Sequence, residues 1–174
     1  MKREIVYWQY AGFVFTAILG TLLHFLYEWS GESAVAALIS GVNESTWEHM
    51  KLLFFPMLGF ALIQSRYFKD TESFWSIKLK GSLIGLLLIP VIFYTYNGAI
   101  GKSPDWFNII IFFVSAATVY IYETLLFKKE SKRYPCNRIS FILLLVMAAL
   151  FIVFTFCTPR LPIFMDPLTG TYGI

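Results

Sequence analysis

Charged side chains are scarce in this chain. Only 14% of its 174 residues are Asp, Glu, Lys or Arg, whereas 57% are hydrophobic and 19% are aromatic. A soluble domain has about 25% charged residues, and a soluble fold of this length could not bury so much apolar surface. The composition therefore excludes an ordinary soluble domain. It predicts an all-α integral membrane helical bundle, because a helix satisfies its own backbone hydrogen bonds in lipid.

Cysteine is also rare, and the sequence contains no internal repeat, low-complexity segment or glycine-rich phosphate loop. The two cysteines are Cys136, in a basic loop, and Cys157, at the far end of the last apolar stretch. A helix between them would separate them by about 30 Å at 1.5 Å per residue. A disulfide requires Cα atoms within about 7 Å of each other, so both cysteines are expected to be free thiols.

Five long apolar stretches are separated by short polar segments. A run of about 20 apolar residues crosses the roughly 30 Å hydrocarbon core of a bilayer, so each stretch is predicted to be a transmembrane helix. These spans cover residues 5–29, 45–65, 74–98, 106–127 and 139–157, and residues 158–174 form an extracytoplasmic tail. The apolar stretch 33–42 is too short to cross and predicts a re-entrant or interfacial helix. One transmembrane domain thus covers residues 1–174.

The first apolar stretch has a rival interpretation as a cleavable signal peptide. Lys2 and Arg3 would supply the basic start of such a peptide. Its apolar run is longer than the usual 7 to 15 residues, so a retained transmembrane helix is the expectation.

The basic residues predict the orientation of the helices. With the N-terminus inside, eleven of the 14 Lys and Arg residues fall in cytoplasmic segments: Lys2, Arg3, Arg66, Lys69, Lys78, Lys80, Lys128, Lys129, Lys132, Arg133 and Arg138. The other three are Lys51, Lys102 and Arg160. Such an excess is the positive-inside signal, so the N-terminus is expected in the cytoplasm and the C-terminus outside. The basic residues form no single face, so the expected partners are membrane lipids and not nucleic acid.

Both histidines of the chain fall at the extracytoplasmic ends of the first two spans. His24 and Glu28 are four residues apart and share one helix face. Glu44 and Glu48 are also four apart, with His49 beside them. Ionisable groups at membrane depth cost several kcal/mol unless they are paired or hydrated, so they usually mark a site. We therefore expect a polar pocket that faces the outer leaflet.

Further polar residues are predicted on the same side of the membrane. Asn97 ends the third span, and Asp166 and Tyr172 lie in the tail. Together with Glu44, these residues are predicted to contribute to binding a lipid-like or small-molecule ligand.

Two kinds of chemistry fit these side chains. In the first, His24, Glu28, Glu48 and His49 would be ligands of a divalent metal such as zinc, manganese or iron. In the second, His24, Glu28 and Glu48 would be metal-free acid–base groups. Glu48 and His49 point about 100° apart on an ideal helix, so both cannot face one centre directly.

The start of the second span also has a purely structural interpretation. The sequence Ser45-Thr46-Trp47-Glu48 fits a capping box, in which Ser45 and Glu48 satisfy the first backbone donors of a helix. Lys51 would pair with Glu48 one turn further on. A structural role alone could therefore account for Glu48.

Glu123 lies near the opposite, cytoplasmic end of the fourth span. Its expected role is a structural ion pair with one of three lysines, namely Lys78, Lys80 or Lys128. A proton or cation relay through Glu123 is the alternative, but no other acidic residue fills the intervening depth.

Three segments resemble an uncharacterised family of small bacterial membrane proteins. They are His24-Phe-Leu-Tyr-Glu-Trp-Ser-Gly31, Val42-Asn-Glu-Ser-Thr-Trp-Glu-His-Met-Lys51 and Asp166-Pro-Leu-Thr-Gly-Thr-Tyr-Gly-Ile174. This resemblance covers nearly the whole chain and implies a location in the bacterial cytoplasmic membrane, but no activity. Separately, His24-x-x-x-Glu28-Trp29 resembles the His-x-x-x-Glu-Gly-Trp of emopamil-binding, sterol-isomerase-like proteins without its glycine. That likeness implies that His24 and Glu28 handle protons.

Three functions remain open at this point. The chain would be a membrane-embedded enzyme acting on a lipid or another amphiphile, with the His/Glu residues as its acid–base or metal-binding groups. The second possible function is a transporter or substrate-binding membrane subunit for a cation or small solute. The third is a structural accessory protein whose polar groups cap helices.

Overall fold

The computed structural model describes residues 2–68, 71–129 and 137–174, and within them the protein is all-α. Six α-helices and a short 3-10 helix occur in the described ranges, and the one β-type contact there is an isolated bridge between Met165 and Tyr172. The elements are α1 (Lys2–Trp29), α2 (Ala34–Ala37), α3 (Thr46–Ser65), α4 (Phe74–Ala99), α5 (Asp105–Lys129), α6 (Asn137–Phe156) and η1 (Pro162–Phe164). Lys69, Lys132, Arg133 and Cys136 lie outside the described residues, and Cys157 is a free, exposed cysteine.

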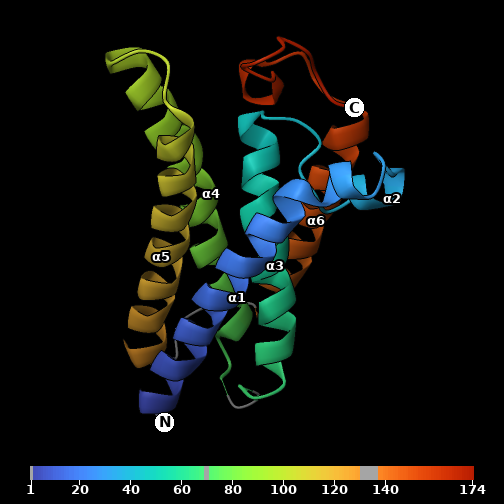
Figure 1. Ribbon diagram of the computed structural model, residues 1–174. Helices are drawn as coiled ribbons and strands as arrows, with labels where there is room; N and C mark the ends of the chain where they lie inside the picture. Colours follow the sequence, from blue (N-terminus) through green and yellow to red (C-terminus); the bar gives the residue numbers. More distant parts are fainter. Residues whose placement is uncertain (1, 69–70, 130–136) are drawn as a thin grey trace.

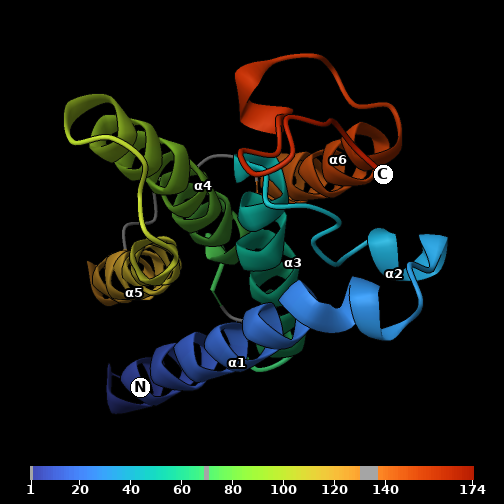
Figure 2. The same ribbon diagram turned by 45° about the horizontal axis from the view of Figure 1, so that its top comes forward.

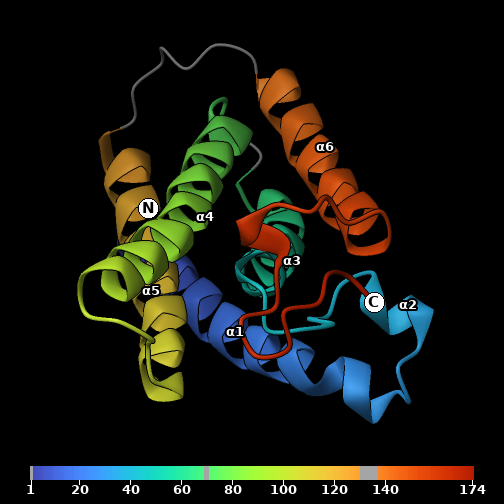
Figure 3. The ribbon, with the colours of Figure 1, turned by 90° about the horizontal axis from the view of Figure 1, so that it is seen from above.

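The five long helices run between two ends of one bundle. The N-terminus lies at one end and the C-terminus at the other (Figure 1), and we refer to these as the inner end and the outer end. α4 and α5 lie side by side, and α1 crosses the bundle obliquely and packs on both α3 and α5 (Figures 1 and 3). Each long helix covers one of the apolar stretches of the sequence.

Four of the helices, α1, α4, α5 and α6, are long and apolar enough to cross a membrane. Many of their large apolar side chains, such as Leu87, Ile110 and Leu143, are exposed on the outside of the bundle. Exposed apolar surface on this scale is costly in water but not in lipid. Four helices thus have the length and apolarity that crossing a membrane requires, and the predicted count of five spans is not confirmed.

The fifth long helix, α3, differs because it lies in the middle of the bundle. Seen from above, α1, α4 and α6 surround it (Figure 3), and its buried residues include Glu48, Lys51 and Gln64. A helix in contact with protein can carry polar residues that a lipid-facing helix cannot. This central position accounts for the charged and polar residues of α3, which is not among the four helices apolar enough to cross a membrane.

The small residues of α4 allow it to approach α5 closely. A methyl group at Gly81 would lie 2.5 Å from Oε1 of Glu123, and one at Gly85 would lie 2.5 Å from Cγ2 of Val119. The sequence Gly81-x-x-x-Gly85 therefore has the close-packing role that small residues at this spacing commonly have in membrane helices.

Two short segments cover the outer end of the bundle. The four-residue α2 lies beside the end of α1 at the edge of the bundle (Figure 2). The C-terminal tail folds back over the start of α3, where the rings of Phe164 and Trp47 lie 4.8 Å apart. Asn43 Nδ2 donates a hydrogen bond of 3.0 Å to the carbonyl oxygen of Gly173. The tail thus holds the loop that leads into α3.

Candidate functional site

At the outer end, one carboxylate lies between the two imidazoles of the protein. Glu44 Oε1 is 3.6 Å from Nε2 of His24, and Glu44 Oε2 is 3.5 Å from Nε2 of His49. The two imidazole ring centroids are 5.7 Å apart. The side chains of His24, Glu44 and His49 are 32%, 41% and 24% exposed, so a ligand can reach them. We call these three residues the outer site.

Each member of the outer site comes from a different element. His24 lies near the C-terminal end of α1, Glu44 in the loop before α3, and His49 in the first turn of α3. The loop is held by Asn43, whose Oδ1 accepts a hydrogen bond of 2.9 Å from the backbone N–H of Ser45. The backbone N–H of Glu44 points toward Oδ2 of Asp166, 3.5 Å away. The tail therefore helps to position the Glu44 carboxylate.

The tautomer of His49 follows from its second contact. His49 Nδ1 lies 3.0 Å from the carbonyl oxygen of Ser45. A carbonyl oxygen can only accept a hydrogen bond, so Nδ1 carries the proton. In a neutral ring, Nε2 then has the free lone pair, and this atom faces Glu44. His49 is thus oriented to take up or release a proton at Nε2.

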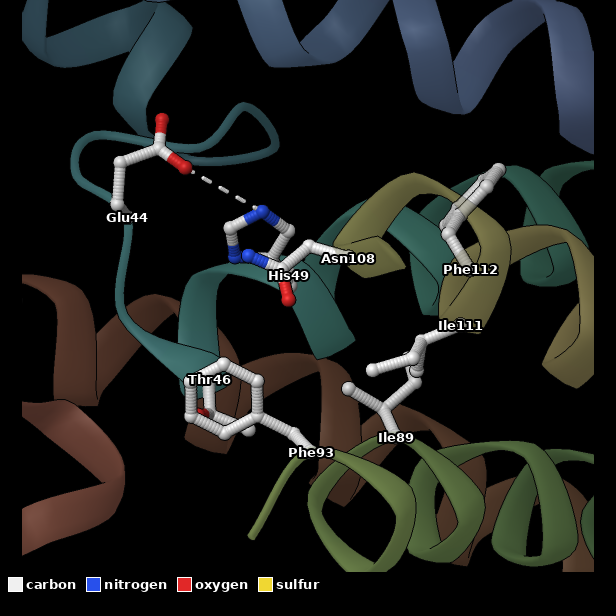
Figure 4. Close-up of a pocket in the computed structure, with 8 residues that line it drawn as sticks. All are labelled: Glu44, Thr46, His49, Ile89, Phe93, Asn108, Ile111 and Phe112. Carbon is white, nitrogen blue, oxygen red and sulfur yellow. Dashed lines mark ion pairs between the residues drawn. The ribbon is translucent and has the colours of Figure 1, made fainter. Parts of the chain in front are cut away.

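The outer site adjoins a pocket between α3, α4 and α5. The pocket has polar residues at one end, Glu44, Thr46, His49 and Asn108, and apolar residues beyond them, Ile89, Phe93, Ile111 and Phe112 (Figure 4). Its volume is about 30 Å³, somewhat more than the roughly 10 to 15 Å³ that one water molecule needs. The pocket therefore admits a small polar group with apolar surface next to it.

Glu48, four residues after Glu44, faces another part of the bundle. Its Oε2 forms an ion pair of 2.5 Å with Nζ of Lys51 and accepts a hydrogen bond from the backbone N–H of Val42, while its Oε1 accepts one from Thr155 Oγ1. Lys51 Nζ also donates to Thr155 Oγ1 and to the carbonyl oxygen of Ala37. Both charged side chains are buried and satisfied, so this network ties α3 to α6 and to α2.

The expected capping box at the start of α3 is half formed. Ser45 Oγ accepts a hydrogen bond of 3.4 Å from the backbone N–H of Glu48, as expected. The reciprocal contact is absent, because the Glu48 carboxylate binds Lys51 and the backbone of Val42 instead. The predicted pairing of Lys51 with Glu48 is confirmed.

The remaining predicted site residues lie apart from the pocket. Glu28 is exposed on α1, one turn after His24. Asn97 braces the turn between α4 and α5, accepting a hydrogen bond of 2.8 Å from the backbone N–H of Ser103. Tyr172 lines a separate groove with Thr158, Arg160 and other residues of the tail.

The described residues do not support the predicted metal centre. In residues 2–68, 71–129 and 137–174, no group of three or more His, Cys, Asp or Glu side chains is arranged to hold a metal ion. Of the four predicted ligands, Glu28 faces outward and Glu48 is committed to Lys51. Only His24 and His49 lie close together, and two imidazoles do not complete a typical metal shell.

A second charged centre lies near the inner end of the bundle. Lys78 Nζ and Glu123 Oε2 form the expected ion pair, 2.6 Å long, and both residues are buried. The same ammonium group lies 5.6 to 5.7 Å from the ring centroids of Phe74, Tyr120 and Phe127, within range of cation–π attraction. We call these five residues the inner centre. Lys78 is thus identified as the partner of Glu123.

Several polar residues in and around these sites were not foreseen from the sequence. Asn108 and Thr46 supply polar groups to the pocket, and Thr155 completes the Glu48 network. Gln9 and Gln64 are fully buried polar residues in the inner half of the bundle. A polar residue inside an apolar stretch is itself a signal of a protein-facing position, and it would have identified Gln9 and Gln64.

The fold and the polar pocket define an all-α protein with helices that can span a membrane. The chain belongs to a family of unknown function (DUF6512), whose model matches residues 1–174. The predicted membership of an uncharacterised family is thereby confirmed. No curated protein and no solved structure matches the chain.

Proposed function

We propose that this protein is a membrane-embedded enzyme that acts on a lipid or another amphiphile, with His24, Glu44 and His49 as its acid–base groups. The observation that carries the proposal is the position of the Glu44 carboxylate, between two imidazoles and at the polar end of an otherwise apolar pocket. A carboxylate beside an imidazole stabilises its protonated form and orients the ring.

His49 is the proposed general base. Its Nδ1–H donates to the carbonyl oxygen of Ser45, so the lone pair of Nε2 is directed toward Glu44. The 3.5 and 3.6 Å separations in the outer site are longer than strong hydrogen bonds, and catalytic contacts often shorten only when a substrate binds. When Nε2 takes a proton from the substrate, the His49 ring becomes an imidazolium, which the Glu44 carboxylate stabilises. His24 lies on the other side of the same carboxylate.

The shape of the pocket supports an amphiphilic substrate. Ile89, Phe93, Ile111 and Phe112 offer apolar surface, and Asn108 and Thr46 offer hydrogen-bonding groups beside the outer site. Most small-molecule sites combine apolar walls with a few polar groups in this way. Because the pocket is small, only the reacting group of a lipid would enter it, and the hydrocarbon part would lie along the apolar surface of α4 and α5.

The proposed topology has five spans in the bacterial cytoplasmic membrane. α3 has 20 residues, which at 1.5 Å per residue gives about 30 Å, the thickness of the hydrocarbon core. It would cross the membrane shielded from lipid mainly by α1, α4 and α6. The excess of basic residues at the inner end favours a cytoplasmic N-terminus. The outer site would then lie near the extracytoplasmic leaflet, within reach of lipid headgroups.

The test is lipid conversion by the purified protein. The protein is placed in nanodiscs made with a total bacterial phospholipid extract, and the lipids are analysed by mass spectrometry before and after incubation. The wild type is expected to produce a lipid species of altered mass. Glu44→Gln and His49→Ala should abolish this product, whereas Glu72→Gln, the same change at an exposed position in the inner loop, should retain it.

The other outcomes separate the competing functions. A lipid that stays bound to the wild type without any change in mass, and is lost from Glu44→Gln, would favour a binding or transport subunit. Neither conversion nor specific retention would contradict both of these functions and favour an accessory role. For the topology, a periplasm-active reporter fused to the C-terminus should be active, and the same reporter at the N-terminus should be inactive.

A further inference from the structure

The ion pair of the inner centre leaves one carboxylate oxygen without a partner. Glu123 Oε2 binds Lys78, but Glu123 Oε1 is buried and has no hydrogen-bond partner among the described residues. Lys78 Nζ donates one hydrogen bond, to Glu123, and its remaining protons lie among aromatic rings. A buried, unpaired polar atom costs about 1 to 3 kcal/mol, and more if it is charged.

The ion pair borders a small cavity. Its polar lining consists of Lys78, Ser82, Tyr120 and Glu123, and its apolar lining includes Met57 and Leu144. The cavity has a volume of about 10 Å³, close to the space that a single water molecule requires. A bound water needs two to four polar partners. The Tyr120 hydroxyl is already hydrogen-bonded to Thr16, and Lys78, Ser82 and Glu123 provide the partners.

Two glutamines at the same depth are also unsatisfied. Gln9 and Gln64 are 2% and 0% exposed, and neither side-chain amide has a hydrogen-bond partner among the described residues. The Gln9 amide lies beside the Glu123 carboxylate, in the position of a hydrogen-bond partner, but no contact between the two has the geometry of a formed hydrogen bond. In a membrane, lipid offers no partner to such groups.

The packing of three helices explains why these polar residues share one layer. A side chain at Gly12 of α1 would collide with the rings of Phe60 on α3 and Tyr120 on α5, so the three helices meet there. Residues three or four apart share a helix face. One turn toward the inner end from this contact lie, on the respective helices, Gln9, Gln64 and Glu123.

We propose that the inner centre is a water-binding site, with a water molecule in the cavity beside Glu123, Ser82 and Lys78. The water donates to Glu123 Oε1 and completes the coordination of the buried ion pair. Hydration of this kind reduces the cost of burying two charges, which their mutual attraction alone does not always offset. This site is separate from the outer site and does not depend on the enzymatic proposal.

The proposal can be tested by radiolytic footprinting of the intact protein in nanodiscs. An X-ray pulse converts bound water into hydroxyl radicals, which oxidise neighbouring methionines. Met57 lines the cavity and is 5% exposed, whereas Met50, at 9%, lies in the same apolar core without lining this cavity. We expect Met57 to be oxidised several-fold faster than Met50. Equal or slower oxidation of Met57 would overturn the proposal.

A cavity-filling variant gives an independent readout. Ser82→Val removes a polar partner and fills the cavity. If water occupies the cavity, this variant should lower the oxidation rate of Met57 to that of Met50 and also lower the melting temperature. If the cavity is dry, the same variant fills a void and should raise the melting temperature, which would contradict the proposal. Ser82→Ala, which only removes the hydroxyl, serves as the second variant if Ser82→Val does not fold.

Discussion

The outer site and the inner centre each place a glutamate beside cationic or potentially cationic groups, but the two glutamates have different surroundings. Glu123 is 1% exposed and lies 2.6 Å from Lys78. Glu44 is 41% exposed and lies 3.5 and 3.6 Å from its two histidines. A buried pair is fixed by the packing around it, and removing one partner leaves an uncompensated buried charge. An exposed, loosely spaced group remains free to bind a ligand and exchange protons.

Glu48 extends this comparison, because it shares a short segment with Glu44. Its carboxylate contacts Lys51, Thr155 and the backbone of Val42, so no part of it is free. Position in the sequence therefore does not distinguish a structural glutamate from one whose carboxylate is free to bind a ligand. The two are distinguished by how many partners each carboxylate has in the folded protein.

The largest expected effect comes from breaking the inner ion pair. Lys78→Met leaves Glu123 buried without its cation, and the unfolding free energy in detergent should fall by about 3 to 5 kcal/mol. Chemical unfolding followed by tryptophan fluorescence measures this change. The double variant Lys78→Met/Glu123→Leu should recover most of the loss, because no unpaired charge is left. A single variant as stable as the wild type would show that the pair does not hold the fold.

The next effect concerns the Glu48 network. Thr155→Val removes the hydroxyl that donates to Glu48 and accepts from Lys51, and the unfolding free energy should fall by about 1 to 3 kcal/mol. Thr118→Val is the matched control, since Thr118 is half-buried and its hydroxyl donates to the carbonyl oxygen of Val114 in its own helix. Equal effects of the two substitutions would contradict the network's role.

Gly81→Ala tests the close approach of α4 to the inner centre. The added methyl group would lie 2.5 Å from Glu123 Oε1, and the resulting shift should cost about 1 to 3 kcal/mol of unfolding free energy. Gly59→Ala places the same methyl group in α3 with no atom within 4 Å. It should be neutral or stabilise by up to about 1 kcal/mol, because alanine favours a helix more than glycine does.

The smallest stability effect is expected at the outer site. Glu44→Gln changes a partly exposed side chain and should alter the unfolding free energy by no more than about 0.5 kcal/mol, measured in the same way. The same variant should lose lipid conversion. A large loss of unfolding free energy in Glu44→Gln would mean that Glu44 contributes to stability as Glu123 does. The outer site would then be structural.

The sequence by itself determined the all-α, membrane-spanning character and the positions of the long helices. A chain that crosses lipid needs long apolar helices. Because charged residues are scarce, the stretches that form these helices can be recognised in the sequence. It also identified the pairing of Lys51 with Glu48, because that contact joins neighbouring turns of one helix. For Glu123 it narrowed the partner to three lysines.

Only the tertiary structure decided which polar residues share a site. His24, Glu44 and His49 come together because α1 crosses obliquely over the start of α3 while the tail holds the connecting loop. Thr155 donates a hydrogen bond to Glu48 from more than 100 positions away in the chain. The packing of α4 against α5 makes Lys78 the ion-pair partner of Glu123. Such contacts depend on helix crossing and rotation. In a bilayer, these are set by the packing of side chains between helices and not by the apolarity that the sequence displays.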